Sequence, residues 1–203
     1  SNTQQRRTMI SLLPLDVFGM QSDTITHDGV LFKPLIDMEI VVPNFFVSKC
    51  AKIIEIKKNG KIIYLKHQEW YRGKKEHGEF KGMRVEFSTD IQPYLDNGHQ
   101  YSAYDKFGKR VRRKLYVHTA VLQSWDPYRP YLEQMLLDGI PEEVKEQALS
   151  WPGIMNLIDL AVKNCMIDHI DDNPRNNNID NLRYSNLRDN ANHRKKWESL
   201  DKR

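Results

Sequence analysis

The chain has 203 residues, of which 39% are hydrophobic and 29% are charged. That length allows one full hydrophobic core, or a small core with an appended module. Its apolar runs are much shorter than the roughly 20 residues that a membrane-spanning helix needs, and its first residues are polar rather than signal-like. We therefore expect a cytoplasmic protein without a membrane partner.

Cys50 and Cys165 are the only cysteines in the sequence. Two thiols are too few for a four-thiolate zinc site or for a disulfide framework. We predict that both thiols are reduced and lie in the core, and that the protein holds no structural zinc.

Basic residues are unevenly distributed, although the formal net charge is only +4. Six Lys or Arg and no acid lie between residues 106 and 114, whereas residues 133–146 are mainly acidic. Basic clusters attract polyanions such as nucleic acids, but a run of charge is also typical of an ordinary solvated surface. Composition leaves both interpretations open.

Residues 1–45 form a segment to which no function is assigned. Prolines at positions 14, 34 and 43 interrupt its apolar clusters, and no clear periodicity runs through it. We expect a short helix near residues 9–13, followed by irregular structure or short strands.

Residues 46–117 are predicted to form a module of β-hairpins. Within residues 52–65, two β-branched runs flank Asn59-Gly60, a pair typical of a type I′ turn, in which both central residues have positive φ. Residues 100–105 and 109–117 are expected to pair across a turn at Phe107-Gly108. Apolar and cationic positions alternate in the second of these strands, which puts three cations on one face: Arg110, Arg112 and Lys114. This face suits a phosphate backbone, although an ordinary solvated strand has the same pattern.

Residues 118–164 are expected to be a helical insert that serves as scaffold. Residues 118–125 predict a short helix that ends near Pro127. Residues 131–150 predict two helices separated at Gly139-Ile140-Pro141, the second with acids in its first turn, where the helix dipole favours them. Residues 156–164 predict a further short helix.

Residues 165–203 contain the densest group of chemically useful side chains. Residues 167–170 predict a strand whose end presents Asp168 and His169. Residues 171–178 predict a loop, because Asn and Asp side chains hydrogen-bond nearby backbone. A returning strand over residues 179–185 and a helix that begins at Asn186 complete the order strand, loop, strand, helix.

This segment has the groups that phosphodiester hydrolysis requires. The reaction needs a base to deprotonate water and a cation to neutralise charge on the phosphate. His169 suits the first task, because imidazole titrates near neutral pH. Asp168 and Asn190 offer hard oxygen ligands, which suit one Mg²⁺ or Mn²⁺ that keeps several waters.

The order Asp168-His169, Asn181-Leu182 and then Asn190 resembles the HNH nuclease motif, carried on a ββα-metal finger. The sequence from Asp168 to Asn177, followed by Asn181-Leu182-Arg183-Tyr184, is especially similar to that of phage-type HNH homing endonucleases. Upstream, Val117-His118-Thr119-Ala120-Val121 with Trp125 resembles the helix that precedes the motif in those enzymes.

The resemblance implies a metal-dependent DNA endonuclease, in the cytoplasm of the host cell if a phage encodes it. It implies His169 as general base, Asp168 and Asn190 as metal ligands, and Asn181 as the residue that braces the loop and orients His169. The implied fold is α+β, with a small antiparallel β-hairpin module, a helical insert and a C-terminal ββα-metal finger over residues 165–203. Two features depart from the family pattern: Asp172 stands where Gly is usual, and the insert before Asp168 is long and acidic.

Several basic residues near the motif are assigned to contact with double-stranded DNA. They are Arg183, Arg188, Arg194 and Lys195, together with Arg110, Arg112 and Lys114 of the hairpin module. His193 lies three residues after Asn190 and is a candidate for contact with phosphate or the leaving group. His118 is interpreted as a structural histidine.

Two alternatives to a duplex endonuclease stay open. One is a DNA-binding module whose finger is catalytically inert, and the other is a resolvase of branched DNA. One finger per chain makes one cut, so a double-strand break needs two sites or two visits. We favour a monomer, because no heptad pattern predicts a coiled coil.

Overall fold

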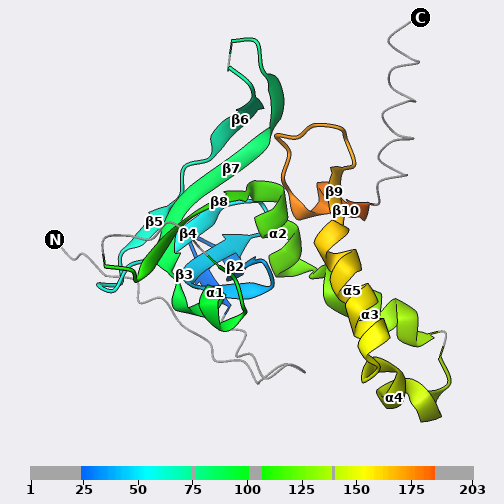
Figure 1. Ribbon diagram of the computed structural model, residues 1–203. Coiled ribbons are helices and arrows are strands. Elements are labelled where there is room, and N and C mark those ends of the chain that lie inside the picture. The colour runs from blue at the N-terminus through cyan, green and yellow to red at the C-terminus, as the bar shows by residue number, and fades with distance from the viewer. Residues whose placement is uncertain (1–23, 75, 101–106, 139, 186–203) are drawn as a thin grey trace, which may run out of the picture.

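The computed structural model describes residues 24–74, 76–100, 107–138 and 140–185 (Figure 1). The helices expected at residues 9–13 and after Asn186 lie outside these ranges. The strands are β1 (Ile25–His27), β2 (Val30–Asp37), β3 (Ile40–Ser48), β4 (Ile53–Ile56), β5 (Ile62–Tyr64), β6 (Gln68–Arg72), β7 (Glu79–Asp90), β8 (Arg110–Tyr116), β9 (Met166–His169) and β10 (Leu182–Ser185). The helices are α1 (Gln92–Asp96), α2 (Val117–Trp125), α3 (Tyr128–Asp138), α4 (Lys145–Leu149) and α5 (Pro152–Asn164), with 3₁₀ turns η1 (Glu142–Val144) and η2 (Ile179–Asn181).

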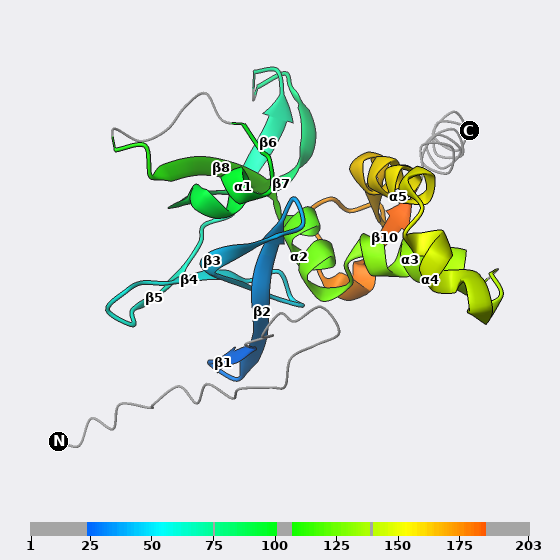
Figure 2. The same cartoon turned by 60° about the horizontal axis from the view of Figure 1, so that its bottom comes forward.

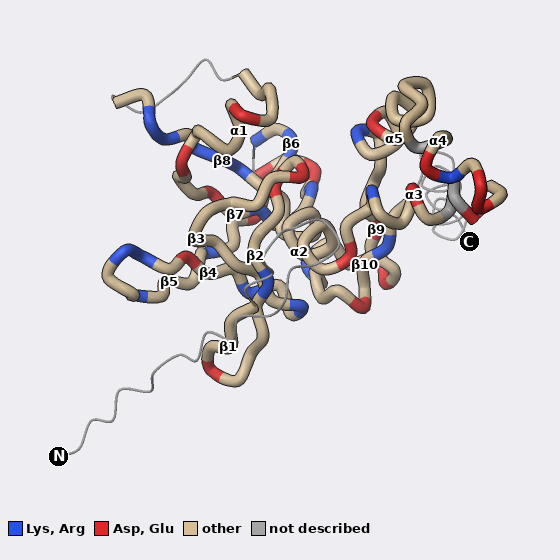
Figure 3. Tube along the Cα trace, turned by 90° about the horizontal axis from the view of Figure 1, so that it is seen from below, with Lys and Arg blue, Asp and Glu red and all other residues tan. Residues whose placement is uncertain are grey.

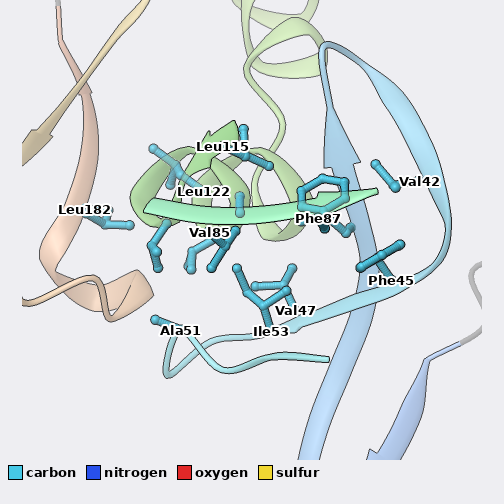
Figure 4. Packing of buried hydrophobic residues seen from close by; sticks show 14 residues of the cluster. Val42, Phe45, Val47, Ala51, Ile53, Val85, Phe87, Leu115, Leu122 and Leu182 are labelled. Carbon is cyan, nitrogen blue, oxygen red and sulfur yellow. The ribbon is translucent and has the colours of Figure 1, made fainter. Parts of the chain in front are cut away.

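The strands form three antiparallel sheets, as expected for a mixed fold of strands and helices. The largest has the order β1-β2-β3-β4-β5, the second β6-β7-β8, and the smallest pairs β9 with β10. The main core joins these layers, because buried side chains from β2, β3, β4, β7, β8 and α2 pack together there. Figure 4 shows β7 passing through this cluster with α2 on one side and the β3–β4 segment on the other.

Before residue 46 the structure has the strands that were one of the two expected alternatives, rather than irregular chain. Residues 25–45 contribute β1, β2 and most of β3, and the expected boundary at residue 45 falls inside β3. Pro34 lies beside a register shift between β2 and β3, and Pro43 precedes Asn44, which has φ +67°. A β-bulge tolerates proline because ladder hydrogen bonds are already interrupted there. The prolines therefore mark an irregularity within a sheet rather than the absence of one.

The hairpin predicted within residues 52–65 is present, but its turn differs. Strands β4 and β5 pair with Ile56 opposite Ile62. Gly60 has φ +79° and donates its N–H to the carbonyl of Lys57 at 2.8 Å, while Asn59 is not among the residues of positive φ. This is a three-residue loop, a type I turn followed by glycine in a G1 bulge, rather than the type I′ turn expected.

Strand β8 pairs with β7, with Asp90 opposite Arg110, a partner that the sequence did not indicate. The expected pairing with residues 100–105 stays a prediction. Residues 101–106 lie outside the described part of the chain, and α1 occupies part of the connection between β7 and β8. The alternation within β8 is as predicted: Val111 and Leu115 are buried, and the three cations of the opposite face are exposed.

One cation of β8 points into the protein instead. The Arg113 guanidinium donates to both carboxylate oxygens of Asp37, at 2.7 and 3.1 Å, and Asp37 is only 1% exposed. The hydroxyl of Tyr94, from α1, donates to the same carboxylate at 2.9 Å. A buried charge requires such partners, so this group joins β2, β8 and α1.

The helical insert has the predicted break but begins and ends differently. Helix α2 matches the expected 118–125, α3 ends at Asp138, and α5 begins at Pro152, four residues before the expected start. Figures 1 and 2 show α3, α4 and α5 extending to one side of the two larger sheets. Arg129 joins this arm to the body by bonding both Glu39, in the β2–β3 turn, and Asp159 of α5.

Neither cysteine lies fully in the core, contrary to expectation. Cys50 is exposed in the turn between β3 and β4, and Cys165 is half-buried between α5 and β9. Among the described helices, none has both the length and the apolar content required to cross a membrane.

Strand β10 fastens the C-terminal segment to the main core. Leu182 is 6% exposed and belongs to the main cluster, where Figure 4 shows it on β10 at the edge of the group. The N–H of Ile179 donates to the carbonyl of Lys49 at 2.9 Å, and the hydroxyl of Tyr184 donates to the carbonyl of Asp126 at 2.7 Å. These contacts place the two short strands against α2 and the β3–β4 turn.

We expect Leu182→Ala to lower the free energy of unfolding by about 2–4 kcal/mol, because it leaves a cavity in a packed cluster. Urea unfolding followed by fluorescence would measure the change. The matched control is Leu157→Ala, since Leu157 is 65% exposed on α5 and should change stability by less than about 0.5 kcal/mol. Equal effects of the two substitutions would contradict the anchoring role of Leu182.

Candidate active site

Strand β9 presents Asp168 and His169 on opposite faces, because successive strand side chains alternate. Asp168 lies opposite Arg183 in the pairing with β10, and His169 lies opposite Leu182. His169 therefore shares its face with the residue that enters the core. Its side chain points toward the body of the protein, while Asp168 points away.

His169 is buried and held by two neighbours. It is 9% exposed, and its Nε2 lies 3.0 Å from the Oδ1 of Asn177 in the loop between the strands. The ring of His118, at the start of α2, meets the His169 ring edge-on, with centroids 5.2 Å apart and planes at 90°. One polar contact and one ring contact thus define the orientation of the imidazole.

His118 belongs to a series of aromatic rings that leads from His169 into the three-stranded sheet. It stacks on Tyr116, with centroids 5.1 Å apart, and Tyr116 meets Trp70 edge-on. Burial, and to a lesser extent His169, lower the pKa of His118 to about 4, so the ring is neutral near pH 7. The structural role expected of His118 is compatible with this position. Its uncharged ring packs directly against His169.

Asp168 forms an ion pair with Arg183 across the two strands. The guanidinium donates to Oδ2 at 2.7 and 3.1 Å, and the carboxylate is 15% exposed. Among the described residues, nothing bonds the other oxygen, Oδ1. Arg183, expected to contact DNA, is in this structure a partner of the expected metal ligand.

The loop of residues 171–178 is held together by its own Asn and Asp side chains. Asn181 donates to the Asp171 carboxylate at 2.7 Å and to the carbonyl of Asn176 at 2.8 Å, and accepts from the N–H of Asp171 at 3.0 Å. Hydrogen bonds from Asn176, from the N–H of Asn173 and from Asn181 lower the pKa of Asp171. Asn181 thus braces the loop, while the side chain that bonds His169 is Asn177.

Two further features of the loop are the backbone conformation of Asp172 and the hydrogen bond of Asn178. Asp172 has φ +58°, a left-handed conformation that glycine adopts without strain and that Asp tolerates better than most residues. The Gly that the resemblance leads us to expect at this position would adopt the same conformation without strain. Asn178 accepts from the N–H of Asp180 at 3.2 Å and so caps η2, in keeping with the loop expected over residues 171–178.

The loop is also fastened to the β6–β7 hairpin. The Arg175 guanidinium donates to Glu69 at 2.9 and 3.1 Å and lies over the ring of Phe80, 4.1 Å from its centroid. Figure 1 shows the β6–β7 hairpin rising beside this loop. The three-stranded sheet therefore contacts the candidate site twice, through Arg175 and through the ring series that ends at His118.

The cationic face of β8 carries a carboxylate at its centre. Glu86 of β7 lies within 2.6 Å of Arg112, 3.2 Å of Arg84 and 3.5 Å of Lys114. The hydrogen bond from Arg112 is the main reason that the pKa of Glu86 is lowered. Arg110 bonds both the hydroxyl and the carbonyl of Ser88. Figure 3 shows this basic strand, together with a basic β4–β5 turn, on the side away from α4 and the acidic turn η1 that precedes it.

Five expected site residues lie outside the described part of the chain: Arg188, Asn190, His193, Arg194 and Lys195. Within the described ranges, no group of three or more His, Cys, Asp or Glu could hold a metal ion. A site with one carboxylate, one amide and several waters would not form such a group. The Asp168 oxygen that no described residue bonds, Oδ1, fits a hard divalent cation of this kind.

Comparison with known families bears on this same segment. Residues 162–192 match the family model of the HNH endonucleases. The match extends from the end of α5 across β9, the loop and β10, and it supports an HNH endonuclease, which implies nuclease activity. No curated protein and no solved structure matched the chain. The rest of the molecule, including both larger sheets, is outside the matched HNH segment.

The sequence did not predict the two side chains that contact His169, Asn177 and His118. Asn177 is one of three consecutive asparagines, and nothing in their sequence distinguishes the buried one from those that form turns. His118 was interpreted as a structural histidine, but its contact with His169 was not predicted. Their contact with His169 depends on how β9 and α2 pack, which residue spacing does not encode.

The lowered pKa of His118 predicts a pH-dependent stability. Between pH 6.5 and about 4 an unfolded histidine binds a proton, whereas His118, packed between Tyr116 and His169, stays neutral. The unfolded state then binds more protons, so the free energy of unfolding should fall as the pH drops through this window, by on the order of 3 kcal/mol at most.

His118→Phe should remove this contribution, which unfolding by urea at several pH values would measure. The control is His77→Phe, because His77 is exposed and its substitution should leave the pH dependence unchanged. A His118→Phe profile parallel to that of the unsubstituted protein would contradict the lowered pKa.

Proposed function

We propose that the chain is a metal-dependent DNA endonuclease of the HNH type, of the phage homing or free-standing kind. The observation that carries the proposal is a buried, oriented imidazole, His169, adjacent in sequence to Asp168, whose Oδ1 no described residue bonds, within the segment that matches the HNH family. Its substrate would be double-stranded DNA, and one Mg²⁺ or Mn²⁺ would serve each site.

In this mechanism His169 accepts a proton from a water molecule, and the hydroxide attacks the scissile phosphorus in line. The bond from phosphorus to the 3′ oxygen breaks, which leaves 5′-phosphate and 3′-hydroxyl ends. Asp168 would hold the divalent ion together with Asn190. When bound, the ion would supply positive charge to the phosphate and to the departing oxygen. His193 is the candidate for contact with the leaving group or phosphate.

The chain's other polar residues have supporting tasks in this proposal. Asn181 keeps the loop in one conformation through three hydrogen bonds. The cations assigned to DNA would hold phosphates: Arg110, Arg112, Lys114, Arg183, Arg188, Arg194 and Lys195. Such contacts supply affinity that falls with salt and carry no sequence information.

We expect His169→Ala to reduce plasmid nicking in Mg²⁺ by about 10²- to 10⁴-fold, the usual contribution of a general base. DNA binding, measured by fluorescence anisotropy in EDTA, should stay within about threefold, because the substitution removes no phosphate contact. His77→Ala, at an exposed histidine, is the control for nicking.

Undiminished nicking by His169→Ala would refute the role of this residue. DNA binding without strand scission under Mg²⁺ or Mn²⁺ by the unsubstituted protein would instead support an inert finger. Four-way junctions compared with linear duplex would reveal a preference for branched DNA.

The charge at the centre of the β8 face allows a separate test of DNA contact. Glu86→Gln removes the carboxylate shared by Arg84, Arg112 and Lys114. We expect tighter binding of duplex DNA at low salt and a salt dependence steeper by roughly one released counterion. The matched control is Glu142→Gln, which removes a carboxylate paired with Lys145 on the helical arm. If the two variants had the same DNA affinity and salt dependence, the assignment of β8 to DNA contact would be wrong.

A further inference from the structure

We propose that Asn177 is a positioning residue that keeps the proton of neutral His169 on Nε2, so that Nδ1 carries the free lone pair that takes the proton from water. This inference rests on the proposed nuclease function, because the choice of nitrogen matters only if His169 acts as a base. The contact between Asn177 and His169 belongs to the structure itself and does not depend on that function.

The first step of the argument is burial. Asn177 is 3% exposed and His169 is 9% exposed, and the Oδ1 and Nε2 atoms are 3.0 Å apart. Buried polar groups are costly unless they are hydrogen-bonded. This pair therefore forms a hydrogen bond that water replaces poorly, unlike a contact at the surface.

The second step is the direction of the hydrogen bond. The Nδ2 of Asn177 donates to the carbonyl of Arg175 at 3.2 Å. If the amide were reversed, Oδ1 would face that carbonyl oxygen, and two acceptors would oppose each other. The amide oxygen must therefore face His169. An oxygen of this kind only accepts, so Nε2 must donate, and in the neutral ring the second nitrogen is then without a proton.

The third step is the surroundings of the ring. His118 meets the imidazole edge-on at 90° and is itself neutral near pH 7, so it restrains the plane of the ring without adding charge. Asn177 adds no charge either. The two neighbours thus fix the ring plane and the tautomer of His169 together.

The test is the ¹⁵N spectrum of the histidine rings in the full chain, without metal or DNA, at pH 8. Protonated and unprotonated ring nitrogens give well-separated signals, and the chain has only seven histidines. Signals of His169 are assigned by their absence in His169→Gln. We expect a protonated Nε2 and an unprotonated Nδ1. A protonated Nδ1 in the unsubstituted protein would overturn the proposal, and this measurement needs no folded variant at position 177.

Asn177→Ala should then convert His169 to a mixture of tautomers or to the form with the proton on Nδ1. In Mg²⁺ it should lower kcat for nicking by about 10²-fold or more, as expected of a base in the wrong tautomer, with KM for DNA within about threefold. The matched control is Asn178→Ala, because the exposed Asn178 bonds only the neighbouring backbone of η2 among the described residues. It should leave the tautomer unchanged.

An unchanged tautomer in folded Asn177→Ala would refute the positioning role. Failure of the proposed function has a different signature: the unsubstituted protein would bind DNA without nicking it, or His169→Ala would nick it normally, while the spectrum of the unsubstituted protein would still show a protonated Nε2.

Discussion

The burial of Leu182 is the constraint on which the position of the candidate site depends. This residue follows Asn181 directly, so inserting its side chain into the core also draws the adjacent loop against α2 and the β3–β4 turn. Two short paired strands bury too little apolar surface to be stable alone. The loop itself is stabilised by hydrogen bonds among Asn and Asp side chains, which give it a fixed shape without a core of its own.

Turn residues show how far the fold was predictable. Asn59-Gly60 indicated a hairpin correctly, while the same kind of signal at Asp28-Gly29, where both residues have positive φ, was not used. The β2–β3 turn was not predictable, because Met38 and Glu39 adopt φ of +53° and +63° without any glycine or asparagine. Such a conformation costs roughly 1–2 kcal/mol per residue and is maintained by tertiary contacts, including the bond from Arg129 to Glu39. The pairing of β7 with β8 is likewise non-local.

The candidate site was predictable to the extent that its groups are close in sequence. Asp168 and His169 are adjacent, and the spacing to Asn181 already indicated a strand, a loop and a returning strand. Residue spacing could not reveal which side chain in a run of similar residues is buried. Arg113 points inward to Asp37 while its neighbours in β8 face solvent, and Asn177 is buried between two exposed asparagines. His118 reaches His169 only because α2 packs against the returning strand.

Because β8 passes directly into α2, the distance between the cationic residues of β8 and the candidate site is fixed. Val117 begins the helix immediately after Tyr116 ends the strand, so no flexible joint separates the cationic residues of β8 from His118, which touches His169. At about 3.3 Å per residue, the strand from Arg110 to Tyr116 spans about 20 Å, the length of roughly six base pairs of duplex. In the proposed endonuclease, a duplex bound along β8 would be cleaved at a set offset from the bound phosphates, and lengthening the strand would move the cut.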